Sequence, residues 1–239
     1  PGRPQNTDST PYLKFDRGAP RNVEAGRWVQ AVDDQLPPTA ELTPETTTPS
    51  VWVLGDAAKY TSRRAMMRDL GRLLVLRGFP LSRLTCFVRT LHPQASGTSV
   101  VWYRDGGHPT ILRVLRGMES TTAFLQSPLP VIFSGAMGIR RRLDRPDELD
   151  DFPILRDLRE EGATDYVAMP LIFSDGMINF VTWTADRPGG FTTAELTELY
   201  DLMPALSARL EILEQRDLTR QLMEIYLGKE TGHRVLAGD

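Results

Sequence analysis

The chain has 239 residues, of which 41% are hydrophobic and 25% charged, the composition of an ordinary globular protein with room for one domain and extensions, or for two small domains. A net charge of −3 provides no basic surface for phosphates, so we expect no nucleic-acid partner. No apolar run reaches the roughly 20 residues that span a bilayer, and the first residues do not resemble a signal peptide. We therefore expect no membrane partner and a cytoplasmic location.

The single cysteine, Cys86, excludes an intramolecular disulfide and a multi-cysteine zinc site. It lies in an apolar run with the pattern of a buried strand, where a thiol acts as a small hydrophobic side chain. The three histidines are far apart and lack the spacing of metal ligands. We expect no metal site in this chain.

Residues 1–50 are rich in proline, threonine, glycine and acidic residues, with only brief apolar clusters. Such a composition buries too little surface to offset the entropy of the chain. The sequence therefore predicts an extended N-terminal arm over 1–50, with a proline-rich linker at 36–50.

Regular structure is predicted from residue 51 onward. Apolar residues at helical spacing indicate a helix over 57–77, which Gly78 and Pro80 end. Three β-branched and aromatic runs separated by proline and glycine then predict an antiparallel meander at 84–93, 98–105 and 109–117.

The next elements are shorter. The pattern predicts a helix at 119–126, a strand at 139–143 and a helix at 152–161. Two strands over 165–186 are joined by Ser174, Asp175 and Gly176, and an Asp-Gly turn supplies the positive backbone angles of a tight hairpin. Strands grouped between flanking helices indicate an α+β domain with one antiparallel sheet.

The last predicted element is a long helix over 192–227. Thr192 and Glu195 have the spacing of a capping box, and Pro204 predicts a kink or a break. Its apolar residues form two stripes in different frames, which predicts that the helix leaves one packing partner and meets another. The first stripe has the spacing of a coiled-coil seam and is formed by Leu196, Leu199, Met203, Leu206, Leu210 and Leu213. The second is formed by Leu218, Leu222 and Ile225. A terminal helix packed on its own sheet explains the first stripe equally well.

This order of elements resembles a GAF or PAS domain, whose sheet is six-stranded and antiparallel. Three segments, "TDYVAMPLIFSDG", "TWTADRPGGFTTAEL" and "YLGKETGHRVLAGD", with "RTLHPQ" at 89–94, also resemble the N-terminal region of a group of bacterial class III adenylate cyclases. The resemblance covers about residues 55–239. It implies a GAF-like sensor at 51–191, a dimerising helix at 192–227 and, at 228–239, the start of a junction to a catalytic domain.

The resemblance implies that catalysis lies elsewhere. In such cyclases every catalytic and metal-binding residue follows the junction, so no catalytic residue is expected in this chain and it needs no cofactor. The catalytic domain of the parent protein would use Mg or Mn to make cyclic AMP from ATP. The chain is expected to form a homodimer through the C-terminal helix and to relay an unknown signal.

A GAF-type pocket would lie between the sheet and the segment 118–160, and it would hold a small-molecule effector. Aromatic and cationic side chains at the expected positions are its candidate lining. They are Trp102, Arg104, Phe133, Arg140, Phe152, Tyr166 and Trp183. The arginine run 140–142 lies beside an acidic cluster, so solvated charges that satisfy each other are its expected role, and an arginine that faces an anionic effector is the alternative. Two alternatives stay open: a dimerisation scaffold without a ligand, and the effector domain of a transcription regulator.

Overall fold

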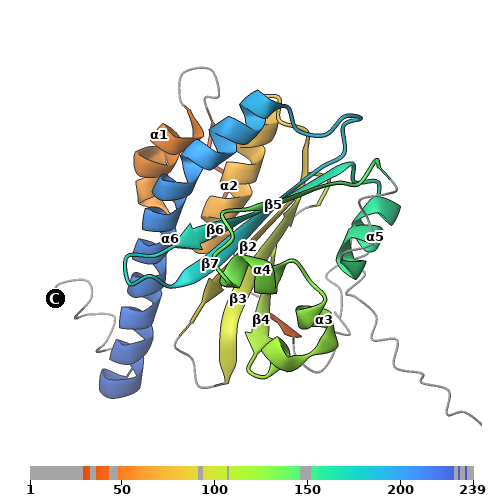
Figure 1. Cartoon of the computed structure of the whole chain (residues 1–239). Helices are drawn as coiled ribbons and strands as arrows, with labels where there is room; N and C mark the ends of the chain where they lie inside the picture. Colours follow the sequence, from red (N-terminus) through yellow and green to blue (C-terminus); the bar gives the residue numbers. More distant parts are fainter. Residues whose placement is uncertain are drawn as a thin grey trace, which may run out of the picture.

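One antiparallel sheet of seven strands, in the order β1-β4-β3-β2-β7-β6-β5, forms the centre of the protein (Figure 1). The structure is a computed structural model that describes residues 29–32, 36–42, 48–90, 94–106, 108–145, 152–228, 231 and 235. The strands are β1 Val29–Val32, β2 Leu81–Arg89, β3 Ala95–Tyr103, β4 Thr110–Leu115, β5 Ile139–Arg142, β6 Asp165–Ile172 and β7 Ile178–Ala185. The predicted α+β class with an antiparallel sheet is confirmed. Strands β2 to β7 form the six-stranded unit, and β1 adds a further strand beside β4.

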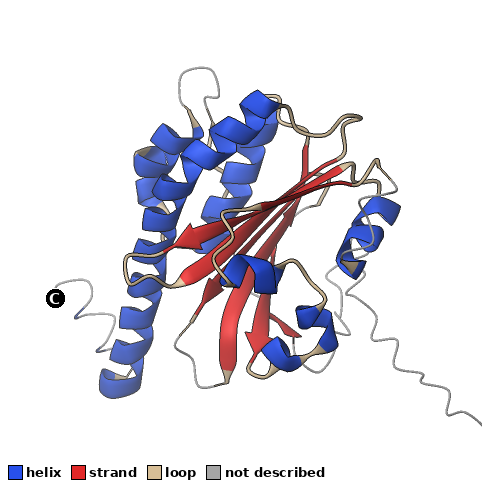
Figure 2. Cartoon of the chain, viewed as in Figure 1, coloured by secondary structure: helices blue, strands red, loops and turns tan. Residues whose placement is uncertain are grey.

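Helices cover both faces of the sheet (Figure 2). The helices are α1 Pro49–Leu54, η1 Asp56–Lys59, α2 Arg63–Leu76, η2 Met118–Ser120, α3 Thr122–Leu125, α4 Leu129–Phe133, α5 Pro153–Glu160 and α6 Thr193–Leu227. Helices α1, α2 and α6 cover one face, which we call the α2 face, and α3, α4 and α5 lie on the opposite α5 face (Figure 1).

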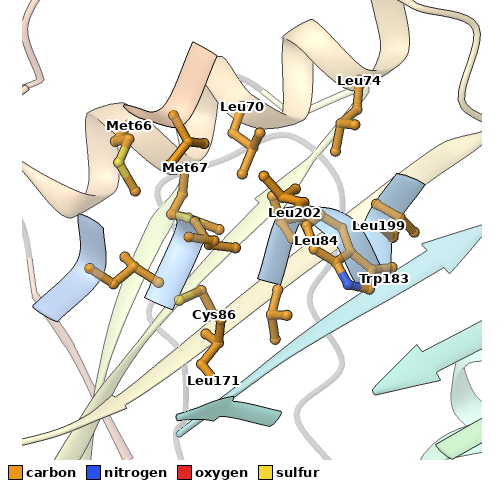
Figure 3. Close-up of a cluster of buried hydrophobic side chains, with 14 of the residues drawn as sticks. Met66, Met67, Leu70, Leu74, Leu84, Cys86, Leu171, Trp183, Leu199 and Leu202 are labelled. Carbon is orange, nitrogen blue, oxygen red and sulfur yellow. The ribbon is translucent and has the colours of Figure 1, made fainter. Parts of the chain in front are cut away.

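The α2 face is a closed apolar core. Side chains of α2 and α6 pack onto alternate residues of the central strands, among them Leu84 and Cys86 of β2 and Trp183 of β7 (Figure 3). Gly71 lets α2 approach β3 closely, because a Cβ there would lie 2.7 Å from the ring of Trp102. Burial raises the pKa of the Cys86 thiol to about 12, so this cysteine is the predicted small hydrophobic side chain.

Part of the segment predicted as an extended arm is tied to α2. The fully buried Asp69 carboxylate accepts hydrogen bonds from the Tyr60 hydroxyl (2.7 Å), the Ala40 amide (3.3 Å) and Arg68 Nε (2.9 Å). Arg68 also donates to the carbonyl groups of Pro37 (2.8 Å) and Pro38 (3.0 Å). A buried ion pair thus holds residues 36–42 against the domain, a contact that composition does not reveal.

Two predicted local motifs are present, and one helix differs from its prediction. Gly176 has φ +81° in the β6–β7 turn, and Thr192 and Glu195 form the capping box of α6. Helix α6 runs through Pro204 without a break. The helix predicted at 57–77 is shorter, because Ser62 caps α2 with a hydrogen bond to the Ala65 amide and a separate turn, η1, precedes it.

Two short helices, α1 and α4, have no counterpart among the predicted elements. Helix α1 begins inside the segment predicted as a linker, where the Thr48 hydroxyl accepts from the Val51 amide and Pro49 occupies the first turn. It is stabilised by burial of Trp52 and Val53 against the core, which a short sequence window does not show.

Candidate functional site

Strand pairing sorts the α5 face into rows of side chains that run across the sheet. Residues paired across antiparallel strands point to the same face. The first row is Tyr103, Arg83, Thr184, Tyr166 and Arg141, from β3, β2, β7, β6 and β5. The second row contains Thr85 and Thr182, and the third contains Phe87 and Phe180. Along β2 and β7 the face therefore changes from a row with Arg83, through a row of hydroxyl side chains, to a row with two phenylalanines.

Arg83 is the central residue of the first row. Its side chain is partly buried, and its guanidinium carbon lies 5.5 Å from the centre of the Tyr103 ring. Its Nε atom is buried without a hydrogen-bond acceptor, and no carboxylate among the described residues forms an ion pair with it. A buried guanidinium N–H without an acceptor is costly, so this position favours an acceptor that carries negative charge.

Two threonine hydroxyls beside Arg83 are also buried without a hydrogen-bond partner. They are Oγ1 of Thr184, whose side chain is 1% exposed, and Oγ1 of Thr85. Each buried, unpaired hydroxyl costs about 1–3 kcal/mol. Burial raises the pKa of Tyr166, whereas the positive charge of nearby Arg83 lowers it. We call Arg83, Thr85, Tyr103, Tyr166 and Thr184 the Arg83 patch.

An aromatic cluster borders this patch. The Phe87 and Phe180 rings stack with centres 5.1 Å apart, and Phe133 of α4 contacts each of them edge to face. Phe124 of α3 stacks on Phe133 at 6.1 Å. The guanidinium of Arg89 lies 5.0 Å from the centre of the Phe133 ring. These contacts attach α3 and α4 to the sheet.

The predicted pocket residues do not share one site. Tyr166, Phe133 and Phe152 belong to the α5 face, as the placement of a pocket beside residues 118–160 requires. Trp102 and Trp183 point the other way, into the closed core of the α2 face. Figure 3 shows Trp183 in this core. Strand alternation causes this separation, because neighbouring positions along a strand face opposite sides.

The two predicted arginines have structural partners. Arg104 follows β3 and forms an ion pair with Asp186. Arg140 donates to the buried Asp165 carboxylate at 2.6 Å and to the Phe191 carbonyl at 2.9 Å, so it ties β5 to the start of α6. Within the 140–142 run, Arg141 points toward the α5 face, 5.8 Å from the Phe152 ring centre, and donates to the carbonyl of Arg140. Sequence reasoning missed Arg83, because the predicted strand began at residue 84, whereas β2 begins at Leu81.

The first stripe of α6 packs within its own domain. Five of its members are at most 8% exposed and belong to the core of the α2 face: Leu199, Met203, Leu206, Leu210 and Leu213. The sixth, Leu196, is partly buried and packs against the same core. The prediction that these side chains form a dimer seam is corrected: the sheet and α2 already cover them, as a helix packed on its own sheet requires.

The second stripe is different, because α6 extends beyond the sheet (Figure 1). Leu222 is 44% exposed and Ile225 is 75% exposed, while Leu218 is partly buried. Most of the 228–239 junction lies outside the described residues, as does the middle of the 89–94 segment. The change of face predicted near residues 214–217 coincides with the point where burial of the stripe ends.

Polar contacts fix the packed part of α6 to three other elements. Glu198 pairs with Arg77 at the end of α2 (2.7 Å), and Arg209 donates to the carbonyl of Tyr60 (2.7 Å). Glu211 accepts from the Ser174 amide in the β6–β7 turn (2.9 Å). Glu214 lies 3.6 Å from Arg63 of α2. The helix and the strands that carry Thr184 and Tyr166 are thus connected directly.

Two further searches concern metals and membranes. The described part of the chain contains no group of three or more histidine, cysteine or acidic side chains arranged to bind a metal ion. None of its helices combines the length and the apolar character needed to cross a bilayer.

No protein-family model and no curated protein sequence matches this chain. Three solved structures are similar to it. The GAF domain of a two-component sensor histidine kinase from Bacillus halodurans is 13% identical, with a TM-score of 0.47, over 65% of this chain and 98% of that one. Free methionine-R-sulfoxide reductase from Neisseria meningitidis is 14% identical, with a TM-score of 0.44, over 74% and 98%. The NLH2 GAF domain from A. aeolicus is 10% identical, with a TM-score of 0.42, over 70% and 96%.

Proposed function

We propose that this chain is the cytoplasmic, GAF-like regulatory sensor of a class III adenylate cyclase. In this proposal the chain forms a homodimer through the second stripe of α6. The helix relays the state of the sensor to a downstream catalytic domain, which uses Mg or Mn to convert ATP to cyclic AMP. The chain itself carries no catalytic residue.

The geometry of α6 is the observation that supports this function best. One end of the helix is fixed to the sheet and to α2, while the other carries apolar side chains with no partner within the described part of the chain. A helix built in this way converts a movement of the domain into a displacement at its far end. The resemblance of three sequence segments to cyclase regulatory regions supports the cyclase as the recipient.

Light scattering on the full chain at several concentrations tests the dimer. Ile225→Glu places a charge on the second stripe, and we expect it to convert a dimer into a monomer. Met137→Glu is the matched control, because Met137 is 71% exposed, close to the 75% of Ile225, but lies between α4 and β5. A wild-type chain that is monomeric throughout contradicts the proposed transmission.

An activity assay tests the cyclase assignment. The parent protein, extended through its following domain, is incubated with ATP and Mg or Mn. We expect cyclic AMP to form, and we expect Ile225→Glu to reduce its formation far more than Met137→Glu. An extended protein that forms no cyclic AMP contradicts the assignment.

A dimerisation scaffold without a ligand is the second candidate, and one observation favours it. The α2 face, which holds two of the predicted pocket residues, is filled by side chains from three helices. Both faces carry buried polar atoms that lack partners among the described atoms, but those of Arg83, Thr85 and Thr184 on the α5 face occupy neighbouring positions on two paired strands. That grouping is the reason we prefer a sensor.

A further inference from the structure

We propose that the Arg83 patch binds a small organic monocarboxylate, whose carboxylate lies between Arg83, Thr85 and Thr184 and whose apolar body points along β2 toward Phe87. This inference rests on the proposed sensor function and gives its effector a chemical class.

Unsatisfied hydrogen bonding is the first argument. Arg83 Nε, Thr85 Oγ1 and Thr184 Oγ1 are all buried and lack partners among the described atoms. Arg83 and Thr184 are directly paired across β2 and β7, and Thr85 is two residues from Arg83 on the same face. The three atoms therefore belong to residues at neighbouring positions on one face of the sheet. A carboxylate oxygen accepts from a guanidinium and from a hydroxyl at once, which removes several of these penalties together.

Charge is the second argument, and it selects the class of anion. The other interior arginines of the α2 face and of β5 have acceptors: Arg68 and Arg140 pair with aspartates, and Arg209 donates to carbonyl groups. For Arg83, by contrast, the contact found within the described part of the chain is with the face of the Tyr103 ring. One guanidinium with two neutral hydroxyls balances a single negative charge, which suits a monocarboxylate better than a phosphate dianion.

The rows of the α5 face define the rest of the ligand. Successive rows are two residues apart along β2, which is about 7 Å, so the Phe87 row begins roughly 13 Å from Arg83. Between them the second row carries the small side chains of Thr85, Thr182 and Ala168, flanked by Val101 and Ile139. Because the proposed carboxylate lies between the first two rows, roughly 7–10 Å remain to the Phe87 row, a length that an acid with a six- to eight-carbon body spans and acetate does not.

Thermal denaturation of the full chain tests this class with paired probes. The probes are acetate, 3-phenylpropionate and octanoate, each compared with its uncharged amide at the same concentration. We expect the two longer acids to raise the melting temperature, and their amides and acetate to have little effect. The inference is overturned if neither long acid stabilises the protein more than its amide.

Two variants place the binding, with calorimetry as the measurement. Arg83→Gln removes the charge, and we expect it to weaken binding of 3-phenylpropionate about 10- to 100-fold, while Thr184→Val removes only a hydroxyl and weakens it about fivefold. Arg113→Gln on β4 is the matched control, since Arg113 pairs with Thr98 and points to the α2 face. Equal affinity in all three variants overturns the inference. If Arg83→Gln does not fold, the inference is tested by the affinity of Thr184→Val for 3-phenylpropionate and by the comparison of each acid with its amide.

A spectroscopic readout on the wild-type protein gives the location directly. The Nε–H of Arg83 has no acceptor in the described structure, so its NMR resonance should shift when a long acid is added. An unshifted resonance during saturable binding places the acid elsewhere and overturns the inference. A chain that dimerises through Ile225 but ignores carboxylates refutes only this inference. A chain that binds carboxylates through Arg83 but stays monomeric refutes only the proposed transmission.

Discussion

Replacement of Asp69 by asparagine should destabilise the protein severely. The side chain keeps its size, but it loses the charge that compensates Arg68, which is itself only 4% exposed. The carboxylate accepts from Arg68 Nε and Nη2 (2.9 and 3.0 Å), Arg72 Nη1 (3.2 Å) and the Tyr60 hydroxyl (2.7 Å). An asparagine has one acceptor oxygen, and its amide group would face these donors.

The size of the effect follows from the burial of the pair. Removing one partner of a buried ion pair costs about 3–5 kcal/mol, because the other charge stays buried and uncompensated. Total stabilities are about 5–15 kcal/mol, so the variant would lose a large fraction of its stability. Asp201→Asn, at an exposed position of α6, is the control, and it should change the free energy of unfolding by less than about 0.5 kcal/mol.

Urea unfolding followed by tryptophan fluorescence measures this difference, and its pH dependence identifies the cause. Burial by itself would raise the pKa of Asp69, but hydrogen bonds from Arg68, Tyr60 and Ala40 hold the pKa below its ordinary value. The stabilisation is therefore present above the unfolded pKa and is lost as the pH falls through the folded pKa. Asp69→Asn should also make residues 36–42 accessible to protease. A loss below 1 kcal/mol at neutral pH, or a loss that persists unchanged in acid, would refute this reasoning.

Three further predictions concern single side chains. Burial raises the pKa of Glu214 above its ordinary value, even though the charge of Arg63 acts in the opposite direction. The folded chain therefore holds this proton more tightly than the unfolded chain does, and stability is lost as the pH rises above the ordinary pKa. Glu214→Gln should therefore be more stable than the wild type at pH 8 in urea titrations, and equal stabilities there would contradict this sign. Gly71→Ala should lower the free energy of unfolding in urea titrations by about 1–2 kcal/mol, because the new methyl group meets Trp102. A higher free energy of unfolding, from the better helix propensity of alanine, would show that α2 moves away from Trp102 without cost. Thr192→Ala should cost about 1 kcal/mol in thermal denaturation through loss of the α6 cap, and a neutral result would show that Glu195 suffices.

Sequence reasoning identified the elements whose local chemistry is decisive. The Asp175-Gly176 turn and the Thr192 capping box each depend on residues within four positions of one another, and both are present. The two stripes of α6 were also recognisable, because helical spacing is a local property. Assigning the first stripe to a partner copy was wrong, since spacing does not distinguish a neighbouring helix from the protein's own sheet.

Features that depend on distant residues were missed. Helix α1 needs the core beneath Trp52, and the 36–42 segment needs Asp69 of α2. The separation of Trp102 and Trp183 from Tyr166 depends on the phase of each strand, and one misplaced position reverses the face. Arg83 illustrates the same limit, because its lack of a carboxylate partner is a property of the folded surroundings alone.

Because Cys86 is buried, its thiol can report how often the folded protein opens its α2 face. Its thiol is the only one in the chain, and in the folded state it lies between the sheet and α2 with a pKa of about 12. A thiol reagent therefore labels a molecule only while the α2 face is open, and mass spectrometry counts a single event per chain. The labelling rate under native conditions reports the free energy of that opening. It does so without any engineered cysteine, and it would register any effector or partner that closes the α2 face more firmly.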